Sequence, residues 1–218
     1  MYDGLLLTTR LKMYVDSIET VIDPKTNTAL AGFKEFNATF ESQFRSQPVE
    51  AIKDILDLDR VLGTILNALG SQHLTLLQTW LTSSAGTPIY DQLVKAAKDF
   101  NYDLSTSGTG SSGNDLLVST KEGDILSGGA GNDLILGGDG DDFIRGGAGN
   151  DTLYGGKGND TYFFELGGGN DTIIETHGDT GTDTLLFGEG ISIGDITIAK
   201  EGNNLILSLS NGRDSVTI

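Results

Sequence analysis

The sequence predicts an α+β protein in which a small helical domain precedes a repetitive β-solenoid and a closing set of β-strands. Apolar residues recur at helical spacing through residues 1–104. One nine-residue pattern then repeats six times between Gly110 and Phe163, and alternating, strand-like segments follow it. We therefore expect three domains: a helical domain over residues 1–104, a repeat domain over residues 105–166 and a C-terminal β cap over residues 167–218.

Five short amphipathic helices are expected in the first domain. The first begins near Leu7, reaches Val21 and is broken by Asp23-Pro24. The last is opened by Thr87 as N-cap and Pro88 as first helical residue, because proline needs no hydrogen-bond partner there. The apolar residues of the other helices span Phe33–Phe44, Val49–Leu69 and Leu74–Leu81, and those of the last span Tyr90–Phe100.

Charge divides the chain in the same place. Residues 105–218 carry 18 acidic and 5 basic side chains, which is −13 of the total formal charge of −17. So acidic a half argues against binding to nucleic acid or an anionic membrane surface and favours cation binding. The sequence has no cysteine, which excludes disulfides and thiolate chemistry. It shows no apolar run long enough to span a membrane and no cleavable leader, so neither is expected.

The repeat has glycine at positions 1, 2 and 4, aspartate at position 6 and an apolar residue at position 8. Four copies are nearly complete: GGAGNDLIL from Gly128, GGDGDDFIR from Gly137, GGAGNDTLY from Gly146 and GGKGNDTYF from Gly155. Two weaker copies precede them, GSSGNDLLV from Gly110 and STKEGDILS from Ser119. One such stretch alone reads as a disordered acidic linker, but six copies in phase favour an ordered, metal-binding solenoid.

The residue types of the repeat suit calcium. Glycine adopts positive φ and lets main-chain carbonyls point into a cramped turn, and the aspartate adds an anionic oxygen. Calcium takes about 6–8 oxygen ligands, more than one turn offers, so a second turn must supply the rest. The position-8 residues are expected to point inward and stack as a thin core: Leu117, Leu126, Ile135, Ile144, Leu153 and Tyr162.

These residues resemble the RTX (repeats-in-toxin) family, most specifically over residues 110–163. The resemblance implies a right-handed parallel β-roll with two nonapeptides per turn and calcium between loops eighteen residues apart. One edge would stack Asp115, Asp133 and Asp151, and the other Asp124, Asp142 and Asp160. The four gaps, Asp115/Asp133, Asp133/Asp151, Asp124/Asp142 and Asp142/Asp160, imply about four Ca²⁺ ions. Family ligation adds loop residues of positions 1–4, which are Gly110, Ser112, Gly113, Gly128, Gly129, Ala130, Gly131, Gly137, Gly138, Asp139, Gly140, Gly146, Gly147, Ala148, Gly149, Gly155, Gly156, Lys157 and Gly158.

Two places depart from the pattern. The copy at Ser119 lacks all three consensus glycines, and Glu122 stands where a positive φ is needed. We therefore expect the Asp124/Asp142 site to be the weakest. After Phe163 the phase slips, so that Asp171 follows Asp160 by eleven residues instead of nine. Asp171 either ligates opposite Asp151 or marks the end of the roll, and we expect the end.

The flanks also carry a resemblance. The tail from Gly181 to the Leu205–Leu209 strand resembles the domain that follows RTX arrays in haemolysin-type calcium-binding proteins. The segment from Tyr2 resembles one in large, iron-regulated, Frp-like RTX proteins. This implies part of a secreted, toxin- or adhesin-like parent chain that leaves the cell unfolded by type I secretion. Extracellular calcium modules bind at about 10⁻⁴–10⁻³ M, so folding would follow export. The implied partners are calcium and the rest of the parent, together with a host or surface protein that the sequence does not identify.

No catalytic residues are predicted. The chain lacks a G-x-S-x-G elbow, an H-E-x-x-H helix, a phosphate-binding loop and a dinucleotide fingerprint, and His73 and His177 share no ligand pattern. Two alternatives to a calcium-binding segment stay open. One is a calcium-activated exoprotein that cleaves itself at Asp23-Pro24. The other is a partner-binding module that presents the aromatic face of Phe33–Phe44.

Overall fold

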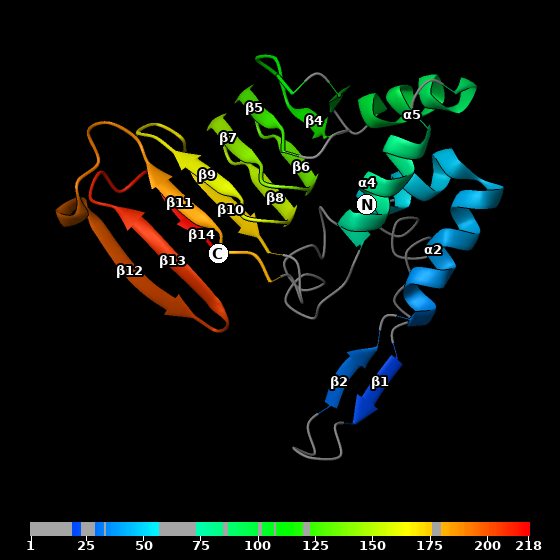
Figure 1. Cartoon of the computed structure of the whole chain (residues 1–218), viewed down its shortest axis with the longest axis horizontal. Coiled ribbons are helices and arrows are strands. Elements are labelled where there is room, and N and C mark those ends of the chain that lie inside the picture. Colours follow the sequence, from blue (N-terminus) through cyan, green and yellow to red (C-terminus); the bar gives the residue numbers. More distant parts are fainter. Residues whose placement is uncertain are drawn as a thin grey trace, which may run out of the picture. The chain divides into compact units, whose positions relative to one another are not determined.

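The computed structural model describes residues 19–22, 29–32, 34–56, 73–84, 87–99, 102–106, 108–119, 123–175 and 180–218. The chain divides into two compact units, Met1–Ala96 and Ala97–Ile218. The first contains a hairpin and helices, and the second is a stack of strands (Figure 1). No helix within those described ranges has the length and apolar character needed to cross a membrane.

The first unit opens with a β-hairpin where the sequence predicted a helix. Strand β1 (Glu19–Ile22) pairs antiparallel with β2 (Ala29–Gly32). The predicted helix is therefore wrong at Val21. Three β-branched residues in succession, at positions 20–22, favour extended backbone, and apolar spacing alone carries no information about a partner strand. The rest of that predicted helix and the Asp23-Pro24 bond lie outside the described residues.

The other helices of this unit follow the predicted positions. They are α2 (Lys34–Ser46), a helical segment over residues 48–56, α4 (His73–Ser84) and α5 (Pro88–Asp99), which spans the division between the units. The predicted third helix is present up to residue 56, and the rest of it lies outside the described residues. Proline is the first helical residue both of segment 48–56 and of α5, as expected. The Thr87 hydroxyl donates to the Ser84 carbonyl (2.6 Å) and so joins α5 to the end of α4.

Helix packing in this unit rests on aromatic and aliphatic contacts. The Phe44 ring of α2 stacks on Trp80 of α4, with ring centroids 4.4 Å apart and planes at 8°. Phe44 is the only residue of the predicted aromatic face whose side chain is described, and it lies against a neighbouring helix. Fully buried side chains at Ile52, Ile55, Leu74, Leu77, Leu81 and Leu93 give the helices a core.

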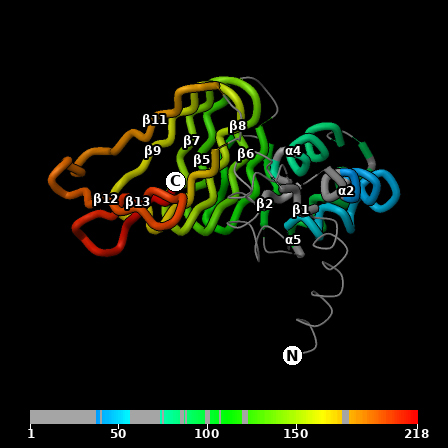
Figure 2. Tube along the Cα trace, turned by 90° about the horizontal axis from the view of Figure 1, so that it is seen from below, coloured from blue at the N-terminus to red at the C-terminus, as the bar shows by residue number. Residues whose placement is uncertain are grey.

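The second unit is built from two parallel sheets whose strands alternate along the chain (Figures 1 and 2). One sheet contains β4 (Asp115–Val118), β6 (Leu134–Asp139), β8 (Thr152–Lys157) and β10 (Asn170–Ile174). The other contains β5 (Ile125–Ala130), β7 (Phe143–Ala148), β9 (Thr161–Phe164) and β11 (Thr184–Phe187). Leu117 pairs with Ile135 and Ile135 with Leu153, a register of eighteen residues, so two nonapeptides make one turn of a parallel β-roll.

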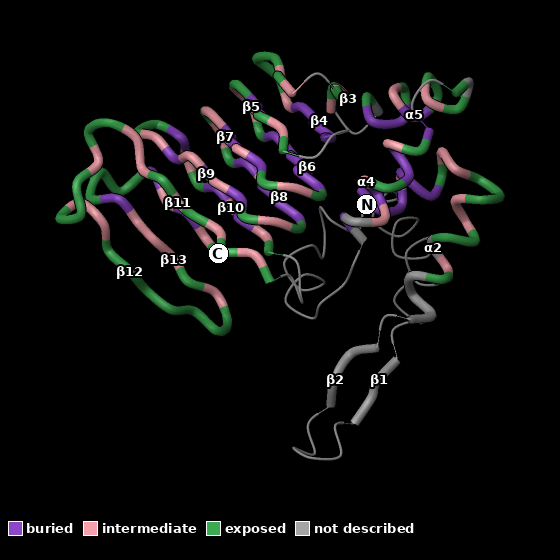
Figure 3. The backbone as a smooth tube through the Cα atoms, viewed as in Figure 1, coloured by how far each residue is buried: buried purple, intermediate pink, exposed green. Residues whose placement is uncertain are grey.

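The interior of the roll is a thin apolar core, as predicted. The six position-8 residues are at most 3% exposed and belong to one cluster with Phe164, Ile173, Leu209 and Val216. Buried and less buried residues alternate along β7 and β9 because neighbouring side chains of a strand point to opposite faces of the sheet (Figure 3). The position-8 pattern therefore sets which face of every strand points inward.

The roll does not end where the repeat slips, which corrects the sequence-based expectation. β10 pairs parallel with β8, with Thr172 opposite Thr152, and β11 pairs parallel with β9, with Leu185 opposite Tyr162. These registers are 20 and 23 residues instead of eighteen. The extra residues fall in the connections, where no strand partner constrains the chain length, so the pairing of strands survives the slip.

Short strands extend the stack at both ends. β3 (Asp103–Ser105) pairs parallel with β4. At the other end β14 (Ser215–Thr217) pairs parallel with β10 and antiparallel with β13 (Asn204–Leu209), which pairs with β12 (Ile196–Glu201). A 3₁₀ turn, η1 (Ile193–Asp195), leads into β12. Ile196, Leu209 and Val216 join the core, so the closing strands share it with the roll.

Candidate metal centre

The position-6 aspartates form two columns, one along each edge of the roll. In the first, Asp133 Oδ1 accepts the backbone N–H of Asp115 (2.8 Å), and Asp151 Oδ1 accepts that of Asp133 (2.8 Å). In the second, Asp142 Oδ1 accepts the N–H of Asp124 (2.6 Å), and Asp160 Oδ1 accepts that of Asp142 (2.9 Å). Each of the four predicted pairs thus joins loops of adjacent turns.

Both columns continue beyond the in-phase repeats. Asp171 Oδ1 accepts the N–H of Asp151 (3.0 Å), and Asp183 Oδ1 accepts the N–H of Asp160 (2.9 Å). The first column therefore contains four aspartates, at positions 115, 133, 151 and 171, and the second four, at positions 124, 142, 160 and 183. Neither Asp171 nor Asp183 was among the predicted site residues, because a search for fixed nine-residue spacing discards both.

A second ladder, made by position 5, runs beside the aspartates and was missed. Asn114 Oδ1 accepts the N–H of Asn132 (2.7 Å), and Asn132 Oδ1 accepts that of Asn150 (2.8 Å). On the other edge Asp141 Oδ1 accepts the N–H of Asn159 (2.8 Å). The signal is present in the sequence, since five of the six copies have Asn or Asp at position 5. These side chains hold neighbouring loops together alongside the position-6 carboxylates.

The second carboxylate oxygen of three aspartates is buried and accepts no hydrogen bond. These atoms are Oδ2 of Asp133, Asp142 and Asp151, and each of the three residues is 2% exposed. A buried anionic oxygen without a donor is costly, so such an atom indicates a ligand that supplies positive charge.

Carbonyl oxygens of the next turn lie close to two of these atoms, Oδ2 of Asp133 and of Asp142. A Cβ built on Gly128 would lie 2.1 Å from Asp133 Oδ2 and 2.5 Å from the Gly146 carbonyl oxygen. A Cβ on Gly137 would lie 2.6 Å from Asp142 Oδ2 and 2.5 Å from the Gly155 carbonyl oxygen. Position 1 is therefore glycine because a carboxylate of its own loop and a carbonyl of the next turn converge beside it. Oxygens from two turns meeting at one point form a donor set that calcium accepts.

The donor set is not made of side chains alone. In the described part of the chain, no three His, Cys, Asp or Glu side chains are grouped so that they could hold a metal ion. One position-6 carboxylate lies in each loop, so most of the remaining oxygens would come from the main chain or from water. This composition fits calcium, which accepts carbonyl oxygens and irregular geometry, and it fits zinc poorly.

Burial disfavours the ionised form of these carboxylates. It raises the pKa of Asp133 to about 7 and the pKa values of Asp142 and Asp151 to about 6. Neighbouring aspartates of the same column raise the pKa of Asp133 and Asp142 further, against the hydrogen bond that each accepts from the preceding turn. A divalent cation between the turns would lower these pKa values, because its charge compensates for the lost hydration and offsets the repulsion between neighbouring aspartates.

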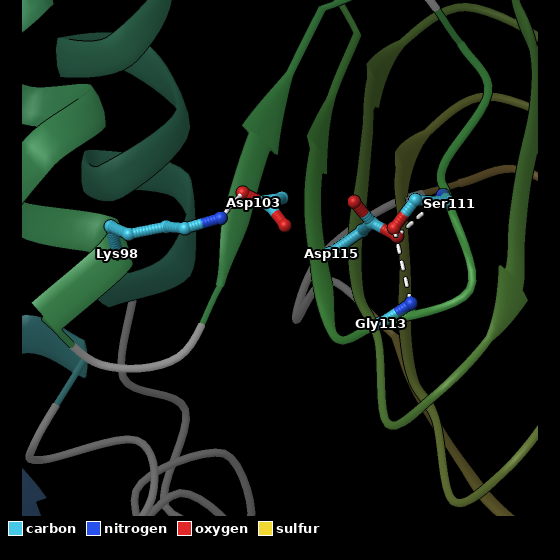
Figure 4. A network of polar contacts seen from close by, with 5 residues as sticks. All are labelled: Lys98, Asp103, Ser111, Gly113 and Asp115. Atoms are coloured by element: carbon cyan, nitrogen blue, oxygen red, sulfur yellow. Dashed lines mark hydrogen bonds and ion pairs between the residues drawn. The ribbon is translucent and has the colours of Figure 1, made fainter.

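The first two copies satisfy their aspartates differently. Asp115 Oδ2 accepts the backbone N–H of Ser111 (2.6 Å) and its hydroxyl (3.0 Å), as Figure 4 shows. Asp124 Oδ2 accepts the Ser119 hydroxyl (2.7 Å). Serine stands at position 2 or 1 in these copies, where the later copies have glycine. The hydroxyl supplies a hydrogen bond that Asp133, Asp142 and Asp151 lack, so these two carboxylates need a cation less.

Asp124 differs further from its neighbours. It is half-buried, whereas Asp142 one turn later is 2% exposed. The positive φ of this loop is at Gly123 (+71°), next to the aspartate, and Glu122 lies outside the described residues. That the Asp124/Asp142 gap holds metal least well stays a prediction.

Two ion pairs join residues of the loops and strands next to the aspartate columns. Lys98 forms an ion pair with Asp103 of β3, the residue paired with Asp115 in the preceding turn (Figure 4). Lys157 Nζ lies 3.0 Å from Asp139 Oδ1, and these residues occupy position 3 of adjacent turns. The predicted position-3 ligands Asp139 and Lys157 therefore use their side chains on each other. Only their carbonyls remain available to a metal.

One family of known proteins matches most of the residues that form the two columns. The family described as RTX calcium-binding nonapeptide repeat (4 copies) matches residues 109–144, 127–162 and 136–173. Residues 109–173 thus carry RTX calcium-binding repeats. The solved structure of the AlgE6R3 subunit from the Azotobacter vinelandii mannuronan C5-epimerase is similar at 26% identity, covering 52% of this chain and 76% of that chain, with a TM-score of 0.37. No curated protein sequence matches the chain.

Proposed function

We propose that this chain binds calcium between adjacent turns of its β-roll and that calcium binding drives the roll to fold. The observation that carries the proposal is the buried, unpartnered Oδ2 of Asp133, Asp142 and Asp151. A folded roll without cations keeps these oxygens out of water with no hydrogen bond, so the metal-free fold is disfavoured. Calcium supplies the missing partner, and its binding free energy becomes folding free energy.

We assign the four predicted gaps unequal strength. Asp133/Asp151 and Asp142/Asp160 are the strongest, because the first carboxylate of each pair has an open oxygen beside a carbonyl of the next turn. Asp115/Asp133 and Asp124/Asp142 are weaker, because serine already donates to the first carboxylate of each pair. The proposed roles are binding and folding, with no catalytic residue.

The cellular setting is part of the proposal. We infer a segment of a secreted, toxin- or adhesin-like protein that is exported unfolded by type I secretion and folds where calcium reaches about 10⁻⁴–10⁻³ M. The charge of −17 supports this, since self-repulsion opposes compaction until cations bind. We propose that the repeat domain over residues 105–166 and the C-terminal domain over residues 167–218, whose strands β10 and β11 continue the roll, fold together, because they share one core.

A calcium titration of the full chain, followed by far-ultraviolet circular dichroism, tests the function. We expect the β signal to rise with a midpoint of about 10⁻⁴–10⁻³ M calcium. Magnesium at the same concentrations is the control and should have little effect, because it requires near-octahedral geometry and retains its water. A β signal that millimolar calcium leaves unchanged would contradict the proposal.

A further inference from the structure

The loop over residues 166–171 reproduces the repeat turn outside its nine-residue phase. Gly167 and Gly169 have φ values of +85° and +100°, as the glycines at positions 2 and 4 of the in-phase loops do. A Cβ on Gly169 would lie 2.0 Å from the Gly149 carbonyl oxygen, the close approach that also separates in-phase turns. Two positions differ: Leu166 replaces glycine at position 1, and a Cβ on Gly167 at position 2 would meet nothing within 4 Å.

This loop is bonded to the preceding turn in the same way as in-phase loops are. Asp171 Oδ1 accepts the N–H of Asp151 (3.0 Å), and Asn150 Oδ1 accepts the N–H of Asn170 (2.9 Å). The Gly149 N–H donates to the Gly168 carbonyl (2.8 Å). The backbone therefore places Asp171 opposite Asp151 as Asp151 is placed opposite Asp133.

The gap between these two loops lacks a positive charge. Asp151 is 2% exposed, its Oδ2 accepts no hydrogen bond, and Asp171 is 4% exposed. Within the described ranges no lysine or arginine forms an ion pair with either residue. Two buried carboxylates on adjacent turns, one with an open oxygen, match the hard, anionic donor set of a calcium ion.

A residue of the cap holds the outer loop of this gap. Asp214 Oδ2 accepts the N–H of Gly167 (2.8 Å), and Asp214 Oδ1 accepts the N–H of Gly169 (3.3 Å). Asn211 Nδ2 donates to the same carboxylate (2.6 Å) and fixes its orientation. Asp214 thus bonds two main-chain amides of this loop, and β14 pairs with β10 immediately after it.

We propose that Asp151 and Asp171 form a calcium site beyond the in-phase repeats, and that Asp214 is a positioning residue which holds the outer loop of that site. The site rests on the proposed calcium-binding function and adds to the four predicted gaps. It makes the last calcium dependent on the cap, so that roll and cap are joined through one ion.

The test counts the calcium ions bound to the full chain by equilibrium dialysis and native mass spectrometry. Asp171→Asn keeps an oxygen that can accept the Asp151 N–H but loses the charge, so it should bind one calcium ion fewer than the natural chain. Asp195→Asn is the matched control: Asp195 lies in the cap, outside both columns, and accepts hydrogen bonds from Ser192 and Ser210. The control should bind the full number.

Asp214→Asn provides a second measurement in case Asp171→Asn does not fold at saturating calcium. Loss of a residue that orients a metal loop typically weakens metal binding by about 10–100-fold, so one ion should bind about tenfold more weakly while the others are unchanged. Unchanged stoichiometry in Asp171→Asn, or unchanged affinity of every ion in Asp214→Asn, would overturn the inference. A natural chain that binds no calcium would instead refute the proposed function.

Discussion

At the scale of single residues, the chemistry of each loop depends on one carboxylate and on what stands at positions 1 and 2. Where both are glycine, as in the loops of Asp133 and Asp151, Oδ2 has no donor. Where serine replaces one of them, a hydroxyl donates to Oδ2 instead. The two copies that contain serine therefore satisfy their own carboxylate, whereas the loops with glycine at both positions leave Oδ2 without a donor.

The contrast predicts unequal mutants along the second edge. Asp142→Asn removes a fully buried carboxylate with an open oxygen, so the calcium midpoint of folding should rise by about tenfold or more. Asp124→Asn removes a half-buried carboxylate that already accepts a hydrogen bond from Ser119. The calcium midpoint of folding should therefore move by less than about twofold, well below the effect of losing a metal-supporting group. Calcium titrations monitored by circular dichroism give both midpoints. Equal shifts in the two variants would refute the ranking of the sites.

The raised pKa values predict an unusual pH dependence without calcium. The ordinary pKa of aspartate is near 3.8, and burial raises that of Asp133 to about 7 and that of Asp171 to about 8. The folded state then binds protons more tightly than the unfolded state, so its stability is greatest below about pH 4 and falls as pH rises from there through the folded pKa values of about 7 and 8. In a chelator, the β signal should increase on acidification from pH 8 to pH 5, and an unchanged signal would show that burial does not raise these pKa values.

At the scale of elements, each strand is held by its register with the turns before and after it. Gly147 has a φ of +113°, and a Cβ on it would lie 2.0 Å from the Gly129 carbonyl oxygen. The separation between turns therefore depends on the absence of a side chain there.

A glycine substitution tests this dependence. Gly147→Ala should destabilise the calcium-bound roll by about 3 kcal/mol, because the methyl group meets main-chain atoms and alanine disfavours positive φ. Gly194→Ala is the control, since a Cβ there meets nothing within 4 Å and its φ is not in the left-handed region. Urea unfolding in saturating calcium measures both. A Gly147→Ala variant as stable as the control would show that the turns can separate at little cost.

At the scale of the whole molecule, the two units have different sources of stability. The first buries an aliphatic and aromatic core within helices, including Ile52, Leu77 and Trp80. The second encloses a thin core between edges that carry columns of buried aspartates. The helical unit has no comparable stack of carboxylates among its described residues, so its stability should not require calcium.

Chelation should therefore unfold the second unit and leave the helical unit folded. On removal of calcium, the β signal of residues 97–218 should be lost while the helical signal at 222 nm persists. Limited proteolysis followed by mass spectrometry locates the change, with new cleavages expected inside residues 105–175 and the buried helices protected. Simultaneous loss of both signals would show that the helical unit also depends on calcium.

The sequence by itself determined the local rules of this protein. Glycines, aspartates and position-8 apolar residues in phase predicted the roll, its two edges, its inward face and the weak loop at Asp124, because each of these depends on spacing within a few residues. Helices α2, α4 and α5 followed from apolar periodicity for the same reason. The hairpin at Glu19–Ile22 did not, since strand pairing depends on a partner rather than on spacing.

Only the tertiary structure decided where the columns end. Asp171 and Asp183 are out of phase in the sequence, yet backbone pairing across turns brings them into line with Asp151 and Asp160. Asp214 is more than forty residues along the chain from the two amides whose hydrogen bonds it accepts, and no local sequence pattern predicts this contact. Contacts between turns depend on which residues lie side by side in space, and connections of different length can bring the same residues together. The last aspartate of each column is therefore visible only in the folded structure.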